Sequence, residues 1–261
     1  PRVMRGWGLS YEELVKIRPD IIMVSNTGYG HSGPWSSHGA MATTMEATTG
    51  ISHFTGYIDG PPANTAHSYT DFQVTSTAIF AILAALSHRE KTGQGQWIDL
   101  SMYQVGATFV AEGLMDYIAN GRIGGHIGNR HPYYAPQGCY PCRDDDCWVV
   151  LTVSSDEEWR TLVQLMDNPA WGQDERFAGA PGRWQHHDEI DAHISEWTKD
   201  KDAYAVFHLL QAHGIASGPV LTNKGALTDP HYRARGFYQM VPHPPETGVG
   251  IRPYINQPWR F

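Results

Sequence analysis

Residues 67–89 read His-Ser-Tyr-Thr-Asp71 and then Phe-Gln-Val-Thr-Ser-Thr-Ala-Ile-Phe-Ala-Ile-Leu-Ala-Ala-Leu-Ser-His-Arg89. The second part is rich in Ala, Leu and Ile, with apolar residues on almost every side. This pattern predicts a helix over 72–89 that is buried on most faces. The polar run before it places Asp71 at the amino end of that helix.

Strand patterns lie on both sides of this helix. Ile21-Ile-Met-Val24 is an apolar run that predicts a buried strand, and it follows a short helix that begins after Ser10. Gly93 ends the long helix, and Trp97–Met102 then predicts a second short strand. Further helices are expected over 40–49 and from that strand to about residue 120. The alternation of helix and strand predicts an α/β fold.

The segment Gly28-Tyr-Gly-His-Ser-Gly-Pro34 is dense in glycine and proline, so it predicts a loop leaving the carboxyl end of the first strand. In open α/β sheets, ligands usually bind outside the carboxyl ends of the strands. This loop is therefore a candidate binding site.

A second unit follows a glycine-rich and proline-rich stretch. The predicted domains are a large α/β domain over 1–125, a smaller α+β domain with linkers over 126–225, and a return toward the large domain over 226–261. The elements expected in the smaller domain are strands at 147–153 and 219–222 and helices at 156–166, 186–198 and 203–213. His186 and His187 are expected on the solvated face of their helix.

Composition narrows the functional classes. The chain has 261 residues, and 19 Lys and Arg stand against 27 Asp and Glu. This acidic balance offers no basic field for nucleic acid or an anionic membrane. Neither a continuous run of eighteen apolar residues nor a secretory signal is present in the sequence, so a soluble, cytoplasmic protein is predicted. The chain lacks an initiator Met and opens directly into a predicted helix, so it is expected to start within a domain.

The three cysteines, Cys139, Cys142 and Cys147, are close together in the sequence. A zinc site would need a second pair of ligands at suitable spacing, and none follows. Reduced thiols are therefore the favoured interpretation, and no metal is expected.

Three collinear motifs carry a resemblance to a known family. They are Ile21–Gly30 with Gly33-Pro34, the loop Thr55-Gly-Tyr-Ile-Asp-Gly-Pro-Pro62 followed by Asp71, and Ala81–Leu86 leading through Lys91-Thr-Gly-Gln-Gly-Gln96 to Asp99. A fourth is Gly128-Asn-Arg-His-Pro132 with Pro141-Cys142. In this order and spacing they resemble the family III (CaiB/BaiF) coenzyme A transferases, such as formyl-CoA transferase and L-carnitine CoA-transferase.

The resemblance implies a Rossmann-like large domain built from both chain ends, a smaller domain between them, and two interlocked subunits. It also implies that an amino-terminal segment of the family fold, which contributes much of the CoA pocket, precedes Pro1. The implied partners are an acyl-CoA, a carboxylic acid acceptor and a second subunit, either identical or homologous. CoA thioesters would be substrates, and no permanently bound cofactor is implied.

In the family, the aspartate at the position of Asp71 attacks an acyl-CoA thioester, and an aspartyl-CoA thioester forms later. A helix amino end favours a negative charge, and apolar neighbours such as Phe72 are expected to limit its hydration. Without the resemblance, Asp71 or Thr70 would be interpreted as an ordinary helix cap.

Other site residues also rest on the resemblance. Gln137 and Gly138, in a mobile glycine-bearing loop, are the candidate oxyanion donors and lid, with an ordinary loop amide as the alternative for Gln137. Contacts with CoA or substrate are expected at Gly28, Tyr29, Gly30, His38, Met41, Arg130 and Tyr134.

Two alternatives remain beside the CoA transferase. Racemases of the family use a histidine at the position of Met41, and methionine cannot exchange a proton, although a shift of alignment would bring in His38. A non-catalytic CoA-binding subunit is the other alternative, and retention of Asp71 argues against it. The donor and acceptor acids are not identified by the sequence.

Overall fold

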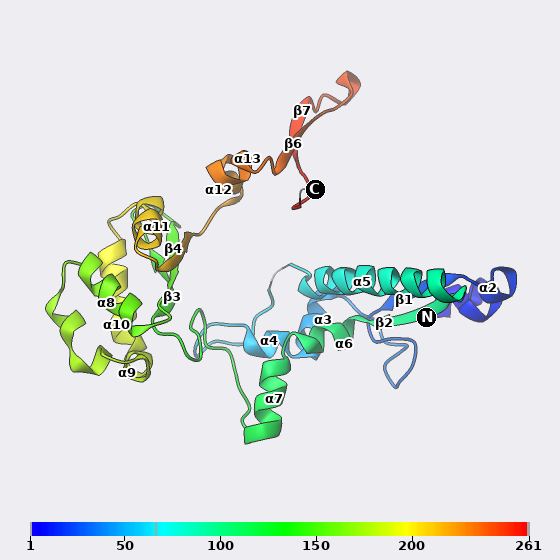
Figure 1. Ribbon diagram of the computed structural model, residues 1–261, viewed down its shortest axis with the longest axis horizontal. Coiled ribbons are helices and arrows are strands. Elements are labelled where there is room, and N and C mark those ends of the chain that lie inside the picture. Colours follow the sequence, from blue (N-terminus) through cyan, green and yellow to red (C-terminus); the bar gives the residue numbers. More distant parts are fainter. Residues whose placement is uncertain (1, 66, 260–261) are drawn as a thin grey trace. The chain divides into compact units, whose positions relative to one another are not determined.

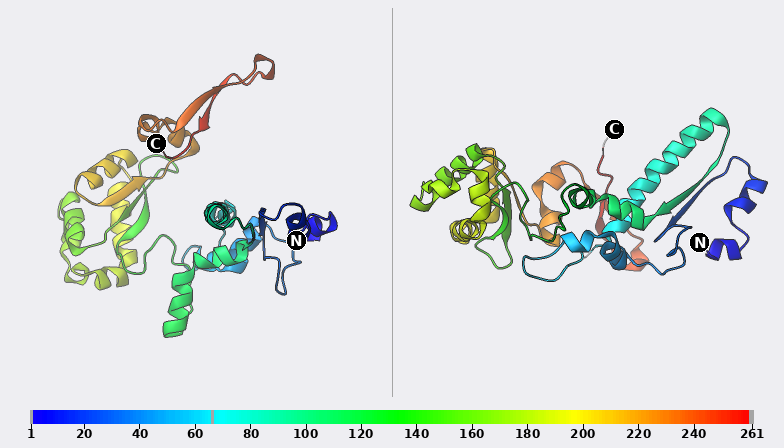
Figure 2. Two further views of the ribbon diagram at one scale, coloured as in Figure 1. Left: turned by 45° about the vertical axis from the view of Figure 1, so that its right-hand side comes forward. Right: turned by 90° about the horizontal axis from the view of Figure 1, so that it is seen from below.

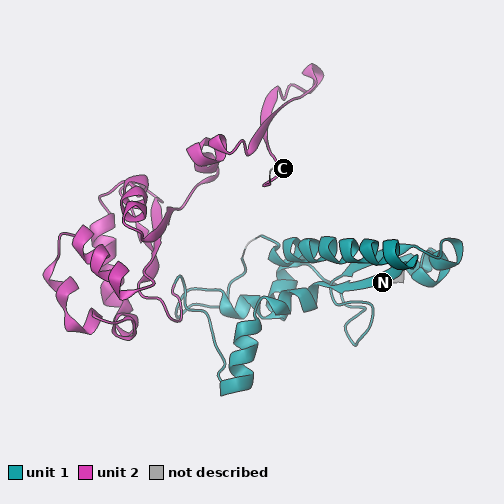
Figure 3. Cartoon of the chain, viewed as in Figure 1, with its two compact units in different colours: residues 1–129 teal, residues 130–261 magenta. Residues whose placement is uncertain are grey.

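The computed structural model describes residues 2–65 and 67–259 (Figure 1). Contacts along the chain divide it into two compact units, residues 1–129 and 130–261 (Figure 3). The division between the two units, after residue 129, falls close to the boundary expected at residue 125. The domain boundaries at 125 and 225 themselves stay predictions.

Unit 1 is built from helices around one pair of strands. Its elements are α1 (Arg2–Gly6), α2 (Tyr11–Ile17), β1 (Ile22–Thr27), α3 (Ala42–Thr49), α4 (Ile51–Phe54), α5 (Tyr69–Thr92), β2 (Gln96–Ser101), α6 (Met102–Thr108) and α7 (Ala111–Asn120). The single helix expected after β2 is thus two helices. No described residue of α7 is buried, and α7 extends away from the rest of the unit (Figures 1 and 2).

Strands β1 and β2 pair in parallel, in register from Ile22 opposite Gln96 to Thr27 opposite Ser101. Parallel strands need a long crossover, and α3, α4 and α5 supply it here. Helix α5 contacts both strands and lies along them (Figure 1). It ends at Gly93, whose φ of 74° suits a residue without Cβ. The predicted strands and the predicted glycine stop are confirmed.

The predicted burial of α5 on most faces is wrong in this structure. Its buried residues are Thr70, Val74 and Ala85, whereas Phe80 is 74% exposed and Leu83 60% exposed. One face of α5 packs on the rest of unit 1, and the described residues leave the other face exposed. By length and mean hydropathy α5 would also fit a membrane span, but helices inside soluble proteins meet the same criteria.

Unit 2 contains two antiparallel sheets and several helices. The strands are β3 (Gln137–Pro141), β4 (Trp148–Thr152), β5 (Ala216–Pro219), β6 (Tyr238–Pro242) and β7 (Ile251–Ile255), ordered β3-β4-β5 and β6-β7. The helices are α8 (Asp156–Leu165), α9 (Ala180–Gln185), α10 (His187–Thr198), α11 (Ala203–Ala212), α12 (Asn223–Thr228) and α13 (Pro230–Ala234), with 3₁₀ turns η1 (Ala170–Gln173), η2 (Glu175–Phe177) and η3 (Pro245–Thr247). The strand expected at 219–222 instead ends at Pro219.

The core of unit 2 lies between the β3-β4-β5 sheet and helices α8, α10 and α11. Alternate residues of β4 point inward, because strand side chains alternate between faces. Fully buried members include Val149, Leu151, Leu162, Ile190, Ile194 and Leu210. Burying each such side chain contributes about 1.5–3 kcal/mol, so this core holds α10 firmly against the sheet.

Candidate active site

The glycine-rich loop after β1 is fixed to the carboxyl ends of both parallel strands. Thr27 Oγ1 accepts the Gly30 N–H at 3.0 Å. The Asp99 carboxylate on β2 accepts the His31 N–H at 3.0 and 3.1 Å and lies 3.4 Å from His31 Nδ1. Gly28 O accepts the Tyr103 N–H at 2.9 Å. These bonds hold residues 28–31 in one conformation above the sheet.

Aromatic rings gather beside this loop. The ring of Tyr29 lies 5.6 Å from Trp35, 6.1 Å from His38 and 5.8 Å from Tyr103 between centroids. The predicted residues Gly28, Tyr29, Gly30 and His38 therefore lie together. Their contacts with CoA stay predictions.

Helix α3 connects the glycine loop with the start of α5. A Cβ on Gly28 would lie 2.2 Å from Ala40 Cβ and 3.2 Å from Met45 Sδ, so the loop packs directly on the entry to α3. Met41 is the residue before α3 and is 73% exposed. A methionine at this position offers no acid or base.

Asp71 is the third residue of α5, and the N-cap is Ser68. The Asp71 N–H donates to Ser68 O at 2.9 Å, while no described residue donates a hydrogen bond to its carboxylate. Phe72 is 68% exposed, so the expected apolar shield from Phe72 is wrong: the helix turn directs this ring to solvent. Thr70 is fully buried, and its Oγ1 has no hydrogen-bond partner among the described residues.

The sequence interpretation did not include Glu46, on α3. Its side chain is fully buried, and its carboxylate accepts the Thr65 N–H, the Thr65 hydroxyl and the Tyr69 N–H at 2.8, 2.8 and 2.9 Å. Burial raises the pKa of Glu46, but the hydrogen bonds from Thr65 and Tyr69 together lower the pKa below its usual value. Glu46 is thus ionised, and its carboxylate accepts a hydrogen bond from Tyr69, the first residue of α5.

Surface grooves lie in unit 1. One of about 410 Å³ is lined by Phe54, Thr55, Gly56, Tyr57, Ala63, Gly128 and Asn129. This groove runs between the loop 55–63 and the segment 124–129. A hydrogen bond of 2.8 Å between His126 Nε2 and Gly60 O links the loop to the segment. The motif Thr55–Pro62 therefore forms a wall of this groove.

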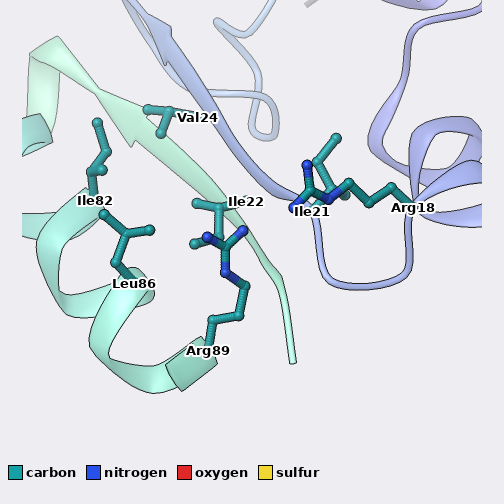
Figure 4. Close-up of a pocket in the computed structure, with 7 residues that line it drawn as sticks. All are labelled: Arg18, Ile21, Ile22, Val24, Ile82, Leu86 and Arg89. Atoms are coloured by element: carbon teal, nitrogen blue, oxygen red, sulfur yellow. The ribbon is translucent and has the colours of Figure 1, made fainter. Parts of the chain in front are cut away.

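Another groove, of about 310 Å³, lies between β1 and α5. Figure 4 shows its lining residues, Arg18, Ile21, Ile22, Val24, Ile82, Leu86 and Arg89. The residues from β1 and α5 belong to the amino end of the strand and the carboxyl half of the helix. Asp71 is at the opposite end of α5, so this groove is separate from the candidate site.

The remaining predicted site residues belong to unit 2. Gln137 and Gly138 do not form a loop, because they open strand β3 opposite Thr152 and Leu151. The Gln137 N–H already donates to His187 Nε2 at 3.3 Å. The structure thus places both residues in a sheet instead of a loop, and their roles as oxyanion donors and lid stay predictions.

Arg130 and Tyr134 are also engaged within unit 2. Arg130 forms ion pairs with Asp188 and with Asp191, the latter at 3.1 Å. Tyr134 stacks on His131 with ring centroids 4.3 Å apart. Binding of CoA by either side chain stays a prediction.

The expectation that His187 is solvated is wrong. Its side chain is 1% exposed, and Nε2 lies 3.5 Å from Asp191 Oδ1, which also accepts the Tyr140 hydroxyl at 2.8 Å. Burial lowers the pKa of His187, which favours the neutral ring. A one-residue error in the assumed helix face explains the mistake, because His186 is the partly exposed neighbour.

The three cysteines are free thiols. Cys142 and Cys147 lie opposite each other in the β3-β4 hairpin, and the Cys142 N–H donates to Cys147 O at 2.7 Å. Burial and the neighbouring thiol raise the pKa of Cys142 to about 11. Within residues 2–65 and 67–259, no group of three His, Cys, Asp or Glu side chains is arranged to hold a metal ion.

A sequence model described as CoA-transferase family III matches residues 1–261. The chain belongs to CoA-transferase family III. The family prediction is therefore confirmed, and so is the α/β fold class with the family III fold. The interlocked dimer stays a prediction.

Relatives of this chain include proteins named as CoA-transferases. The chain is 32% identical over 248 residues to the succinyl-CoA:D-citramalate CoA-transferase of Chloroflexus aurantiacus, covering 95% of the chain and 61% of that protein. It is 32% identical over 238 residues to the acetyl-CoA:oxalate CoA-transferase of Acetobacter aceti, covering 91% and 61%. The chain thus spans about three fifths of the length of these curated relatives.

Solved structures show the same fold. A CaiB/BaiF family protein from Brucella suis superposes with a TM-score of 0.85 at 29% identity, covering 99% of this chain and 66% of that one. A Mycobacterium tuberculosis protein superposes with a TM-score of 0.83 at 23% identity, covering 100% and 68%.

Asp99 is expected to control the mobility of the glycine loop in this family III chain. Asp99→Ala removes the acceptor for the His31 N–H, a charge-assisted bond to a partly exposed carboxylate. Losing about 1 kcal/mol of local stability predicts roughly fivefold faster amide exchange at residues 28–31, measured by mass spectrometry in deuterated water. Asp116→Ala, which removes an acceptor on α7, is the control. Equal exchange in the two variants would contradict the assignment.

Proposed function

We propose that the protein containing this chain is an acyl-CoA:carboxylate CoA-transferase whose nucleophile is Asp71. One observation carries the proposal: in a member of CoA-transferase family III, the carboxylate of Asp71 lies in the first turn of a long helix without a hydrogen-bond partner among the described residues. The amino end of a helix favours an anion. An unpaired carboxylate there is ready to act as a nucleophile.

The proposed reaction proceeds by exchange at carbonyl carbons. An Asp71 oxygen attacks the thioester carbon of the donor, the carbon–sulfur bond breaks, and its electron pair leaves with the CoA thiolate. The thiolate attacks Cγ of the resulting mixed anhydride and expels the donor as a free carboxylate. This leaves an aspartyl-CoA thioester.

The second half reverses these steps with another acid. The acceptor carboxylate attacks Cγ of the aspartyl thioester and releases the CoA thiolate, which then attacks the acceptor carbonyl and frees Asp71. Each step exchanges one activated carbonyl for another, so no proton transfer or outside energy source is required. CoA therefore moves between acids through a covalent enzyme.

The relatives guide the choice of substrates. Those described above are named for succinyl-CoA with D-citramalate and for acetyl-CoA with oxalate. We propose that the donors are short acyl-CoAs and that the acceptors are small carboxylic acids. The enzyme is proposed to act in the cytoplasm as a homodimer or as a heterodimer with a homologue. Gly28, Tyr29 and Gly30 are proposed to contact the CoA thioester, since they lie at the same end of unit 1 as α3 and the start of α5.

Covalent trapping tests the proposal. The protein is incubated with succinyl-CoA or acetyl-CoA, treated with hydroxylamine, and digested for mass spectrometry. A hydroxamate on the peptide that contains Asp71 is expected, because hydroxylamine intercepts both the anhydride and the aspartyl thioester. Binding of CoA without any adduct would sink the transferase proposal and favour a CoA-binding subunit.

Exchange of the α-hydrogen of the acyl-CoA with solvent deuterium distinguishes a racemase from a transferase. A racemase would incorporate deuterium at the α-carbon of an acyl-CoA and form no hydroxamate. The exposed Met41 supplies no proton-exchanging group at the position where family racemases carry histidine. We therefore expect no α-deuteration.

A further inference from the structure

We propose that Glu46 is a positioning residue for the reaction, and that it fixes Asp71 by holding the segment that leads into α5. This inference rests on the proposed function. Glu46 touches neither substrate nor reacting atoms in this assignment. It acts through Thr65 and the backbone of Tyr69.

The contacts of Glu46 span the entry to α5. Its Oε2 accepts the Thr65 N–H, and its Oε1 accepts both the Thr65 hydroxyl and the Tyr69 N–H. Tyr69 is the first residue of α5, two positions before Asp71. A displacement of this turn is therefore carried directly to the Asp71 side chain.

The helix has no cap of its own that could replace Glu46. Ser68 occupies the N-cap with φ 27° and ψ 45°, and its side chain accepts no capping hydrogen bond. The first N–H groups of a helix need an outside acceptor when water is excluded. Because Glu46 takes the Tyr69 N–H, the carboxylate of Asp71 is not required as a cap. One carboxylate satisfies the helix end, and the other remains available for chemistry.

The position of Glu46 is itself rigid. It lies on the buried face of α3 beside Met45, which is fully buried, and Thr49, which is 5% exposed. Met45 also lies next to Gly28, so α3 contacts both the glycine loop and the α5 entry. Met45 and Glu46, adjacent residues of α3, thus fix the position of the glycine loop relative to the start of α5.

A carboxylate suits these three donors better than an amide does. Ionised Glu offers two acceptor oxygens and no donor, whereas Gln offers one oxygen and an NH₂ group. In Glu46→Gln, the NH₂ would face either the Thr65 N–H or the donors at Oε1. The variant keeps shape and volume but breaks at least one of the hydrogen bonds to Thr65 and Tyr69.

Steady-state kinetics of the full protein test the proposal. We expect Glu46→Gln to lower kcat about 10–100-fold, because a displacement of about 1 Å at a reacting group costs on the order of 10²-fold. The KM for acyl-CoA should stay within about twofold, since the substrate contacts are unchanged. A burst of hydroxamate on Asp71 should slow by the same factor as kcat.

Glu158→Gln is the matched control. Glu158 on α8 also accepts a backbone N–H and a hydroxyl, both from Ser154, at 2.7 and 2.9 Å. That change should lower the unfolding midpoint and leave kcat unaltered. Thr65→Val is a second variant that removes a single hydroxyl donor, and it should lower kcat several-fold even where Glu46→Gln fails to fold.

The outcomes separate this proposal from the one on which it rests. A wild-type hydroxamate together with unchanged kcat in Glu46→Gln and Thr65→Val overturns the positioning role alone. Equal losses of kcat in Glu46→Gln and Glu158→Gln also overturn it, because the effect would then follow general stability. Absence of a hydroxamate in the wild type overturns both proposals.

Discussion

Asp71→Asn is expected to lower CoA transfer by on the order of 10³-fold or more, because it removes the proposed nucleophile. The amide has nearly the same shape as the carboxylate, but its oxygen is a poor nucleophile. It also forms neither the anhydride nor the aspartyl thioester. The measurement is the rate of CoA transfer from succinyl-CoA or acetyl-CoA to an acceptor acid, at saturating substrate, in the full protein.

Binding should survive the same substitution. No described residue donates a hydrogen bond to the Asp71 carboxylate, so Asn leaves the local packing intact. We expect CoA affinity and the unfolding midpoint to remain close to those of the wild type. Asp200→Asn, at an exposed turn after α10, is the control and should retain full activity. Turnover of Asp71→Asn within a few-fold of wild type would rule out covalent catalysis at this position.

The secondary structure near Asp71 could be predicted because local signals agree with the tertiary fold. The apolar run at Ile22 forms β1, the Ala-rich and Leu-rich run forms α5, and Gly93 ends it with a positive φ. Each of these depends on a few neighbouring residues. The parallel pairing of β1 and β2 then follows from the helical crossover between them.

The faces of these elements were harder to predict. A helix that is apolar all round can be buried all round, yet α5 leaves Phe72 and Phe80 exposed in this chain. Periodicity reports which side chains are apolar, and only contacts decide which are covered. The same uncertainty misplaced His187, whose burial depends on its bonds with Gln137 and the nearby Asp191.

The candidate site was predictable only in part. Asp71 followed from the family resemblance, because an Asp before a helix is otherwise interpreted as a cap. Glu46 gave no signal, since one acidic residue in an eight-residue helix is typical of a solvated face. Its partners, Thr65 and Tyr69, are 19 and 23 positions away in the sequence, and no local pattern links them.

No local sequence pattern predicts the contacts of Arg183 in unit 2 either. Its substitution is expected to have the second large effect. Its side chain is 1% exposed. Its guanidinium donates to Ala135 O at 2.7 Å, to Phe177 O at 3.0 Å and to Asp156 Oδ1 at 2.7 Å. It also lies 5.5 Å above the ring of Trp159. One side chain thus joins the segment before β3, the η2 turn and helix α8.

Arg183→Met is expected to destabilise unit 2 strongly. Met fills a similar volume but has no donors, so the carbonyls of Ala135 and Phe177, both in fully buried residues, lose their partners. Each buried acceptor left unsatisfied costs about 1–3 kcal/mol, which gives roughly 2–6 kcal/mol for the two. Urea unfolding of the whole chain, followed by tryptophan fluorescence, should show a lowered midpoint.

Arg176→Met supplies the comparison, because Arg176 forms more ion pairs but at the surface. It contacts Asp174 and Glu189, and its side chain is 46% exposed. Solvent screens such pairs and hydrates the groups left behind, so the midpoint should hardly change. If stability followed the number of ion pairs, Arg176→Met would be the more damaging change. We expect the opposite order, because the donors of Arg183 serve carbonyls that water cannot reach.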